Sequence, residues 1–461
     1  MKDKTSQTGI NRRSFLQSTA AVSASLAFSP YIFTQAVQGA SSADDLNVAL
    51  LGAGAEGQVL LNACKDIPGI HFKAVCDIWE AYNLRRTSRI LKSQGHDVKD
   101  YVDYQDMLAD QKDLDAVIIA TPDFWHSPHT CACLEAGLHV YCEKEMSNTV
   151  EGAKKMVETQ KKTGKLLQIG HQRRSNPRYN HCYNKLIKEA NLLEQITTVY
   201  GQWNRGKTAC EDLIVPRDTE IDPAILKKYG FDSMHQFRNW RWYKGLGGGP
   251  IVDLGSHQID IYSWFLEANP KSVMASGGVD YWKPPVCETA HDWYDNVMAI
   301  YEYETKLGTV RAFYQTITTN SAQGYFEQFM GLEGTLIISE ASGRGTVYRE
   351  AWVDAAKWEP WTEKKYITAI EEEKPEETED SGVVLDVRES PKPPAYDIPV
   401  SMEGKPYHQP HLENFFGAVR GKAKLNCPAE IGYETAVTVL KVNEAVEAGK
   451  KLDFKEEDFK A

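Results

Sequence analysis

Paired cysteine motifs, long apolar runs and an excess of positive charge are all missing from this 461-residue sequence. The nine cysteines are odd in number and lack CxxC spacing, which predicts buried free thiols and no metal site. A formal net charge of −12 argues against phosphate neutralisation, so nucleic acid is not an expected partner. No run after the amino-terminal segment is apolar enough to cross a bilayer, so the mature chain is predicted to have no membrane span.

The composition that remains is that of a globular protein, with 42% hydrophobic and 25% charged residues. The length favours two domains. Eleven Trp and 22 Tyr suit sugar-binding surfaces, cores or subunit interfaces. The acidic segment 371–380 is predicted to be a solvated surface loop.

The first 43 residues are typical of a targeting segment. Arg12 and Arg13 precede a modest apolar stretch, residues 20–33, and small residues follow near Ser41. A disordered basic tail would not account for this order of basic, apolar and small-residue regions. The pattern predicts a twin-arginine export signal with linker (1–43) and a periplasmic location.

A strand, a glycine turn and a helix follow. Residues 46–51 are apolar, and Gly52, Gly54 and Gly57 then form a GxGxxG pattern that includes Glu56. In a dinucleotide site these glycines permit the turn, the approach of a pyrophosphate and the packing of the helix. The next predicted strand ends at Asp77, whose carboxylate can accept hydrogen bonds from ribose hydroxyls and repels a 2′-phosphate. NAD is therefore expected, and NADP less so, although Asp77 capping the next helix is the alternative interpretation.

The alternation of helices and strands continues to Gly170, with helices expected at 81–95 and 128–137 and another that opens with an Asn148–Glu151 cap pair. This predicts a parallel Rossmann sheet over 44–170. Ligands bind beyond the carboxyl ends of such strands, which places these residues near the cofactor: Thr121, Pro122, Asp123, Trp125, His126, Glu143 and Lys144.

Strand character returns at 196–203, 297–303, 309–317 and 335–338. These segments predict a strand-rich second domain over 171–461.

The motifs occur in the order found in one known family. They are the glycine turn, Asp77, Thr121-Pro-Asp-x-x-His126, Glu143-Lys144, Gly247-Gly-Gly-x-x-x-Asp253-x-Gly-x-His257 and the segment 407–416. The chain resembles the glucose-fructose oxidoreductase, inositol dehydrogenase and rhizopine-catabolism family over nearly its whole mature length. The resemblance implies a Rossmann domain followed by a substrate-binding and oligomerisation α+β domain (171–461). In the family this domain has a large, open, mostly antiparallel sheet that is often used for homo-oligomerisation.

Oxidation of a secondary alcohol needs a base for the hydroxyl proton. If 251–265 is one helix, Asp253 and His257 are spaced i and i+4 on one face, and Asp253 would favour the imidazolium form of His257. His257 is the candidate base. The resemblance implies that Lys144 contacts the reacting hydroxyl and the nicotinamide ribose, although a solvated charge cluster is the alternative for this segment.

Glu145 stands where the family has proline. A non-proline cis bond costs roughly 3 kcal/mol, so we expect the loop to follow a different path. Flanking Glu143 and Glu145 would keep Lys144 protonated, which favours an electrostatic role.

Further candidates for binding substrate follow the last Rossmann strand or precede the glycine run: His171, Arg173, Arg174, Tyr179 and Trp242. Ion pairing at the domain junction explains the two arginines equally well, and core packing explains the tryptophan nearly as well.

These features predict an exported enzyme that oxidises a secondary hydroxyl of a sugar or glycoside, with the 3-hydroxyl expected, by hydride transfer to tightly bound NAD. A nicotinamide that stays bound must be returned to its oxidised form on the enzyme. A second carbonyl substrate does this in glucose-fructose oxidoreductase, and a redox-neutral glycosidase cycle does it in related NAD-dependent α-N-acetylgalactosaminidases. A third alternative is a non-catalytic, nucleotide-bound sugar-binding protein.

Overall fold

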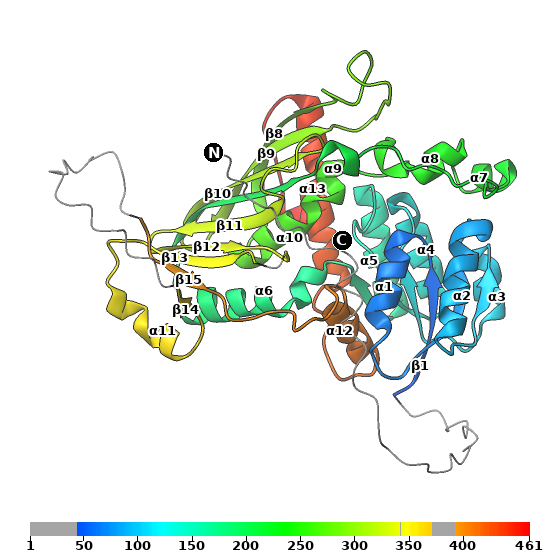
Figure 1. The fold of residues 1–461 in the computed structure, drawn as a ribbon, viewed down its shortest axis with the longest axis horizontal. Coiled ribbons are helices and arrows are strands. Elements are labelled where there is room, and N and C mark those ends of the chain that lie inside the picture. Colours follow the sequence, from blue (N-terminus) through cyan, green and yellow to red (C-terminus); the bar gives the residue numbers. More distant parts are fainter. Residues whose placement is uncertain (1–43, 342, 371–391) are drawn as a thin grey trace, which may run out of the picture. The chain divides into compact units, whose positions relative to one another are not determined.

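The computed structural model describes residues 44–341, 343–370 and 392–461 (Figure 1). The predicted export signal (1–43) and the acidic segment 371–380 lie outside the described residues. Residues from Asp44 onward pack into one unit that holds two separate sheets.

The first sheet is parallel and has six strands in the order β3-β2-β1-β4-β5-β6. This is the Rossmann strand order. The strands stay parallel, but the side of the sheet on which successive strands are added changes between β1 and β4. The inner strands are continuous apolar runs because both faces are covered by helices. The strands are β1 (Leu46–Leu51), β2 (Ile70–Cys76), β3 (Lys99–Tyr101), β4 (Ala116–Ile119), β5 (His139–Cys142) and β6 (Leu167–Ile169).

Helices connect these strands, with a π-helical turn (Glu80–Leu84) leading into the second of them. They are α1 (Ala55–Cys64), α2 (Arg85–Ser93), α3 (Tyr104–Asp110), α4 (Asp123–Glu135) and α5 (Val150–Thr163).

Two predicted helix starts are wrong. The cap of α5 is Thr149, whose hydroxyl accepts a hydrogen bond from the Gly152 amide at 3.1 Å, and not Asn148. Helix α4 begins at Asp123, and Pro128 lies inside it.

The second sheet has ten strands in the order β14-β15-β13-β12-β11-β7-β10-β9-β8-β16. All neighbours are antiparallel except β7 and β10, as the sequence predicts for a mostly antiparallel sheet. The strands are β7 (Ile196–Asn204), β8 (Pro270–Gly278), β9 (Asn296–Thr305), β10 (Gly308–Ile317), β11 (Tyr325–Gly331), β12 (Gly334–Ile338), β13 (Gly345–Arg349), β14 (Thr368–Ala369), β15 (Ala395–Asp397) and β16 (Leu452–Asp453).

Helices α10 and α13 pack on this sheet, and α13 also contacts α5, so it joins the two halves (Figure 1). The remaining helical segments are α6 (Pro177–His181), α7 (Pro223–Lys228), α8 (Met234–Arg238), α9 (Pro250–Asp253), α10 (Gly255–Leu266), α11 (Glu359–Glu363), α12 (Gln409–Val419), α13 (Ala429–Ala448), a π-helix (Cys182–Glu189) and 3₁₀ turns at 172–175, 207–209, 240–242, 355–357 and 456–459.

Residues 205–249, which we call the cover segment, pack against the Rossmann half. This segment includes α7 and α8, which Figure 1 shows extending from α9. The indole of Trp79 donates a hydrogen bond to the Thr219 carbonyl at 2.5 Å, and that of Trp125 donates to the Tyr229 carbonyl at 2.9 Å. Apolar residues of both halves complete a small separate core, which includes Ile221, Leu226, Phe231 and Leu246.

All nine cysteines are free thiols, and eight of them are buried, as the sequence predicts. Among the described residues, no helix is both long enough and apolar enough to cross a membrane.

Candidate active site

The glycine turn lies at the carboxyl end of β1. Gly52 has φ +94°, and a Cβ there would lie 2.5 Å from the Ala120 carbonyl oxygen. A Cβ on Gly57 would lie 2.0 Å from the carbonyl oxygen of Gly52, so this glycine lets α1 pack on the turn. Gly54 borders open space, with only the Asn83 amide at 3.7 Å, and its side has room for a ligand backbone. No side chain caps α1, which leaves its amides to an anion.

Asp77 follows β2 and faces this turn. Its carboxylate accepts hydrogen bonds from the amides of Ala53 (2.8 Å) and Trp79 (2.7 Å) and from the Asn83 side chain (3.3 Å). Burial raises the pKa of Asp77 above its ordinary value, although these hydrogen bonds oppose the shift. A fixed acidic side chain beside the glycine turn fits the ribose of an adenine dinucleotide.

One cavity of about 620 Å³ runs from Asp77 past the glycine turn to the second sheet. Most of the predicted site residues line it. They are Gly52, Gly54, Glu56, Asp77, Thr121, Pro122, His126, Glu143, Lys144, Trp242, Asp253 and His257. The geometry therefore brings the predicted cofactor and catalytic residues to one place. Gly57 lies outside this lining, and its role here is packing.

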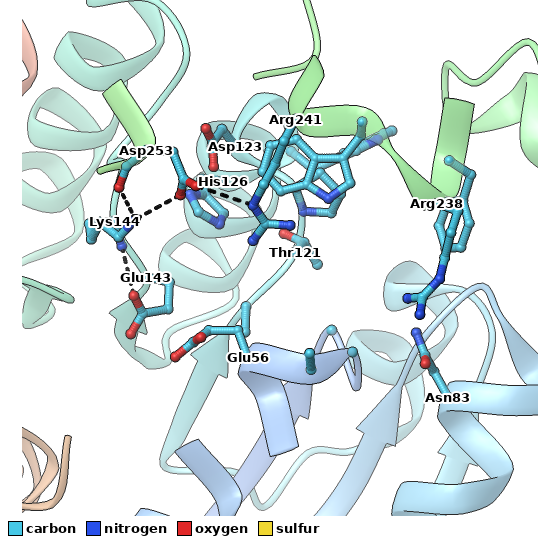
Figure 2. Close-up of a pocket in the computed structure, with 18 of the residues that line it drawn as sticks. Glu56, Asn83, Thr121, Asp123, His126, Glu143, Lys144, Arg238, Arg241 and Asp253 are labelled. Atoms are coloured by element: carbon cyan, nitrogen blue, oxygen red, sulfur yellow. Dashed lines mark hydrogen bonds and ion pairs between the residues drawn. The ribbon is translucent and has the colours of Figure 1, made fainter. Parts of the chain in front are cut away.

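Lys144 and Asp253 form an ion pair in this cavity (Figure 2). The Lys144 ammonium lies 3.0 Å from Asp253 Oδ1 and also donates to the Asp253 carbonyl at 2.6 Å. Burial disfavours the charge on Lys144, but Asp253 and then Asp123 outweigh burial and raise its pKa. Burial likewise opposes ionisation of Asp253, yet Lys144 and Arg241 hold its pKa well below the ordinary value. Lys144 is therefore a cation, as the sequence predicts, but its main partner is Asp253 and not Glu143 or Glu145.

His257 is a neutral base in this environment. Its side chain is buried, and its Nδ1 has no hydrogen-bond partner. Burial lowers its pKa well below 6.5, and Lys144, Arg173 and His171 lower it further. The expected imidazolium is therefore wrong. The helix divides at Leu254 into α9 and α10, and the Asp253 carboxylate instead pairs with Lys144 and, at 3.5 Å, with Arg241.

Several other carboxyl groups in or beside the cavity have raised pKa values. Burial, followed by the charge on Asp253, raises the pKa of Asp123 to about 7. Burial raises the pKa of Glu143 to about 8, with Glu56 adding to the shift, and burial raises that of Glu145 to about 8. Burial thus favours the protonated form of all three groups.

The peptide bond between Lys144 and Glu145 is cis. The different loop path expected from glutamate in place of proline stays a prediction. The Glu145 side chain is fully buried and accepts a hydrogen bond from the Met146 amide at 2.8 Å.

Four predicted substrate residues lie outside the cavity lining. Arg173 is buried between Glu327 and Glu340, with its Nε 2.9 Å from Glu340, and Arg174 pairs with Asp260 at 2.8 Å. The Tyr179 hydroxyl donates to Glu327 at 2.7 Å. Buried ion pairs, the alternative open for the arginines, thus replace the predicted sugar contacts of Arg173 and Arg174, and a hydrogen bond replaces that of Tyr179. His171 is buried behind the cavity, with neither ring nitrogen hydrogen-bonded.

Part of the cavity lining was not predicted from the sequence. Arg205 and Arg241 come from the cover segment, and Trp203, Tyr325 and Glu340 come from the second sheet and its edges. Arg241 stands in an Arg-Asn-Trp-Arg-Trp segment, where the density of cations and tryptophans was the available signal. Trp203, Tyr325 and Glu340 belong to no sequence motif.

Glu56, Glu143 and His408 offer metal-ligand atoms within 4.8 Å of one another. The prediction of no metal site rested on cysteine spacing, which says nothing of these three residues, since they lie far apart in sequence. They line the same cavity beside the glycine turn, where cofactor hydroxyls are equally suitable partners for the two carboxyl groups.

The fold and the site together define a Rossmann-type dinucleotide-binding protein with an appended α+β domain. Residues 46–171 match the model of the oxidoreductase family with an NAD-binding Rossmann fold, GFO/IDH/MocA, and residues 226–337 match that family's C-terminal domain. The chain belongs to the GFO/IDH/MocA oxidoreductase family.

Curated relatives match about half of this chain. The scyllo-inositol 2-dehydrogenase (NADP(+)) IolW of Bacillus subtilis (strain 168) is 28% identical over 246 residues, 52% of this chain and 57% of the relative. A glycosyl hydrolase family 109 protein of Shewanella baltica (strain OS185) is 30% identical over 265 residues, 52% of this chain and 54% of the relative. The chain thus spans little more than half the length of these relatives.

Solved structures share the fold over a greater length. Levoglucosan dehydrogenase in complex with NADH and levoglucosan has a TM-score of 0.65 at 16% identity, covering 89% of this chain and all of that one. The WlbA dehydrogenase from Bordetella pertussis, in complex with NADH and UDP-GlcNAcA, has a TM-score of 0.62 at 15% identity, covering 89% and 98%.

Proposed function

We propose that this protein is an NAD-dependent oxidoreductase that oxidises a secondary hydroxyl of a sugar or glycoside, at the 3-position. The observation that carries this proposal is the Lys144–Asp253 ion pair beside neutral His257, in the cavity that also contains the glycine turn. Dehydrogenases among the relatives and NADH complexes among the structural neighbours support it.

The residues divide the work. The glycine turn and Asp77 would hold NAD, which would supply the acceptor for the hydride of the carbinol carbon. His257 takes the hydroxyl proton, since it lines the cavity and its imidazole is neutral. The Lys144 cation stabilises the negative charge that grows on the hydroxyl oxygen, and Asp253 fixes the position of its ammonium group.

We further propose that the cofactor stays bound. The cover segment packs on Trp79 and Trp125 and lines the cavity beside Asp77. From this segment, the Arg238 guanidinium lies 5.4 Å from the Trp79 ring, and Figure 2 shows it directed toward Asn83. An adenosine group in this part of the cavity would therefore be enclosed between the Rossmann half and the cover segment. Asp77 favours NAD over NADP, since it would repel a 2′-phosphate.

The redox-neutral glycosidase is the second candidate, and the 30% identity to a glycosyl hydrolase family 109 protein favours it. A ketone at the 3-position acidifies the neighbouring C–H bond, so the glycosidic bond is lost by elimination. Water then adds to the unsaturated ketone, and the hydride is returned to the 3-carbon. The two cycles differ in outcome, because only the oxidoreductase leaves a lastingly reduced nucleotide until a second carbonyl compound is added.

We propose a periplasmic location on the basis of Arg12, Arg13 and the apolar stretch that follows. We also propose a homo-oligomer through the open sheet. Met274, Met298 and Ile300 on β8 and β9 are 39–49% exposed, and this apolar patch suits a second copy of the chain. Met298→Asp is expected to yield monomers in light scattering, and an unchanged mass would contradict the proposed interface.

The experiment is to purify the protein, identify any nucleotide that copurifies, and follow its absorbance as sugars and glycosides are added singly. Lys144→Ala and His257→Ala should retain the nucleotide and lose its reduction. Turnover that is indifferent to both substitutions would overturn the assignment.

A further inference from the structure

A pair of aromatic rings extends the cavity beyond the candidate base. Trp203, near the end of β7, and Tyr325, at the start of β11, are cross-strand partners whose rings stack with centroids 4.4 Å apart. The Trp203 ring also lies 5.3 Å from the His257 ring. All three residues line the cavity, so the aromatic surface begins at the candidate base and continues away from it.

Two buried acceptor oxygens lie at this end of the cavity. Gln172 and Glu340 are at least nine-tenths buried and also line the cavity. The Gln172 amide nitrogen lies 3.4 Å from Glu340 Oε2, while Gln172 Oε1 and Glu340 Oε1 have no hydrogen-bond partner. A buried acceptor without a donor costs about 1–3 kcal/mol, so these oxygens are suited to a ligand that supplies hydroxyl donors.

Arg173 holds the two parts together. Its guanidinium carbon lies 5.6 Å from the centroid of each ring, and its Nε binds Glu340 at 2.9 Å. A buried cation bound to Glu340 and close to both rings fixes the carboxylate relative to the aromatic surface. Arg173, which the sequence predicts to touch substrate, thus positions Glu340 and the two aromatic rings instead.

We propose that Trp203, Tyr325, Gln172 and Glu340 form a second sugar subsite, so that the substrate is a glycoside with at least two sugar rings and not a free monosaccharide. This proposal rests on the proposed function, which places the reacting ring between His257 and Lys144. A single pyranose ring covers about one aromatic side chain, so Trp203, beside the base, can stack on the whole of the reacting ring. The second ring stacks on Tyr325 and donates hydroxyl hydrogen bonds to the two free oxygens. A phenyl aglycone would use the rings and leave both oxygens without donors.

The test uses the full nucleotide-loaded protein and matched substrates. Methyl, phenyl and disaccharide glycosides of glucose and galactose, in both anomers, are compared by kcat/KM for reduction of the bound nucleotide. The disaccharide should exceed the methyl glycoside by about tenfold or more, equivalent to about 1.4 kcal/mol, and should also exceed the phenyl glycoside. A phenyl glycoside that equals the disaccharide would overturn the role of the oxygens.

Variants separate this inference from the proposed function. Tyr325→Ala and Glu340→Gln should lower the ratio of disaccharide to methyl-glycoside kcat/KM by about tenfold. Tyr200→Ala is the matched control, because Tyr200 stacks on Phe313 in the same sheet but lies outside the cavity lining. An unchanged ratio in Tyr325→Ala overturns the subsite while turnover of methyl glycosides upholds the oxidoreductase. Should no substrate reduce the nucleotide, calorimetric titration of cellobiose and lactose into wild type and Tyr325→Ala still tests the subsite, and equal affinities refute it.

Discussion

Asp253→Asn should convert Lys144 from a permanent cation into a group that titrates in the working pH range. Two unit charges 3.0 Å apart attract by about 5 kcal/mol at an effective dielectric constant of about 20. Burial opposes the Lys144 charge, and Asp253 is the strongest group that sustains it. Without Asp253 the pKa of Lys144 falls.

The expected result is a shift of the alkaline limb of kcat to lower pH by at least about one unit, which corresponds to about 1.4 kcal/mol. Activity requires protonated Lys144, so it is present below the pKa of this group and lost as pH rises through that pKa. The assay is the pH profile of nucleotide reduction under saturating glycoside. Asp123→Asn is the matched control, because Asp123 contributes less than Asp253 to the raised pKa of Lys144, whereas Asp253 also accepts hydrogen bonds from the Lys144 ammonium. An alkaline limb that stays in place in Asp253→Asn, or shifts equally in both variants, would refute the electrostatic role of Lys144.

Gly54→Ala should leave the melting temperature near that of wild type but reduce the amount of copurified nucleotide, because the added Cβ would point into the cavity. Gly57→Ala should instead lower the free energy of unfolding by about 1–3 kcal/mol in a denaturant titration, since the added Cβ meets the Gly52 carbonyl oxygen. Equal behaviour of the two variants would contradict these separate roles. Trp79→Ala should cost about 3–5 kcal/mol of stability and release nucleotide on gel filtration, whereas full retention would show that the cover segment does not enclose it. The acid limb of kcat should lie below pH 6.5, because burial lowers the pKa of His257; an acid limb above that value that persists in His257→Gln would assign the base elsewhere.

The Rossmann half could be predicted from sequence because its signals are local. The glycine turn, the apolar run of β1 and the position of Asp77 depend on residues within one strand–helix–strand unit. The structure also brings Lys144, Asp253 and His257 to one cavity, as their motifs predict. Their partners were harder to predict. The helical spacing of Asp253 and His257 suggested a direct pair, but the helix divides at Leu254 and Asp253 turns to Lys144, 109 positions away in sequence.

The rest depends on contacts between distant segments. Trp203 and Tyr325 meet only because β7 and β11 pair in one register, and no periodicity along either strand encodes that register. Arg173 and Arg174 differ from surface arginines only through Glu327, Glu340 and Asp260, which come from other elements. The raised pKa of Glu143 likewise follows from burial, which its charged neighbours in sequence do not suggest.

The carboxyl-terminal end of the cover segment is tied to the Rossmann half and leads directly into the ion pair. The Phe124 amide donates to the Leu246 carbonyl at 3.3 Å, and seven residues further along the chain comes Asp253, the partner of Lys144. Lifting this segment far enough to free a nucleotide would pull on the backbone that holds Asp253. We therefore expect exchange of nucleotide and chemistry on sugar to exclude one another in time, so that a molecule open to exchange is, for that interval, catalytically silent.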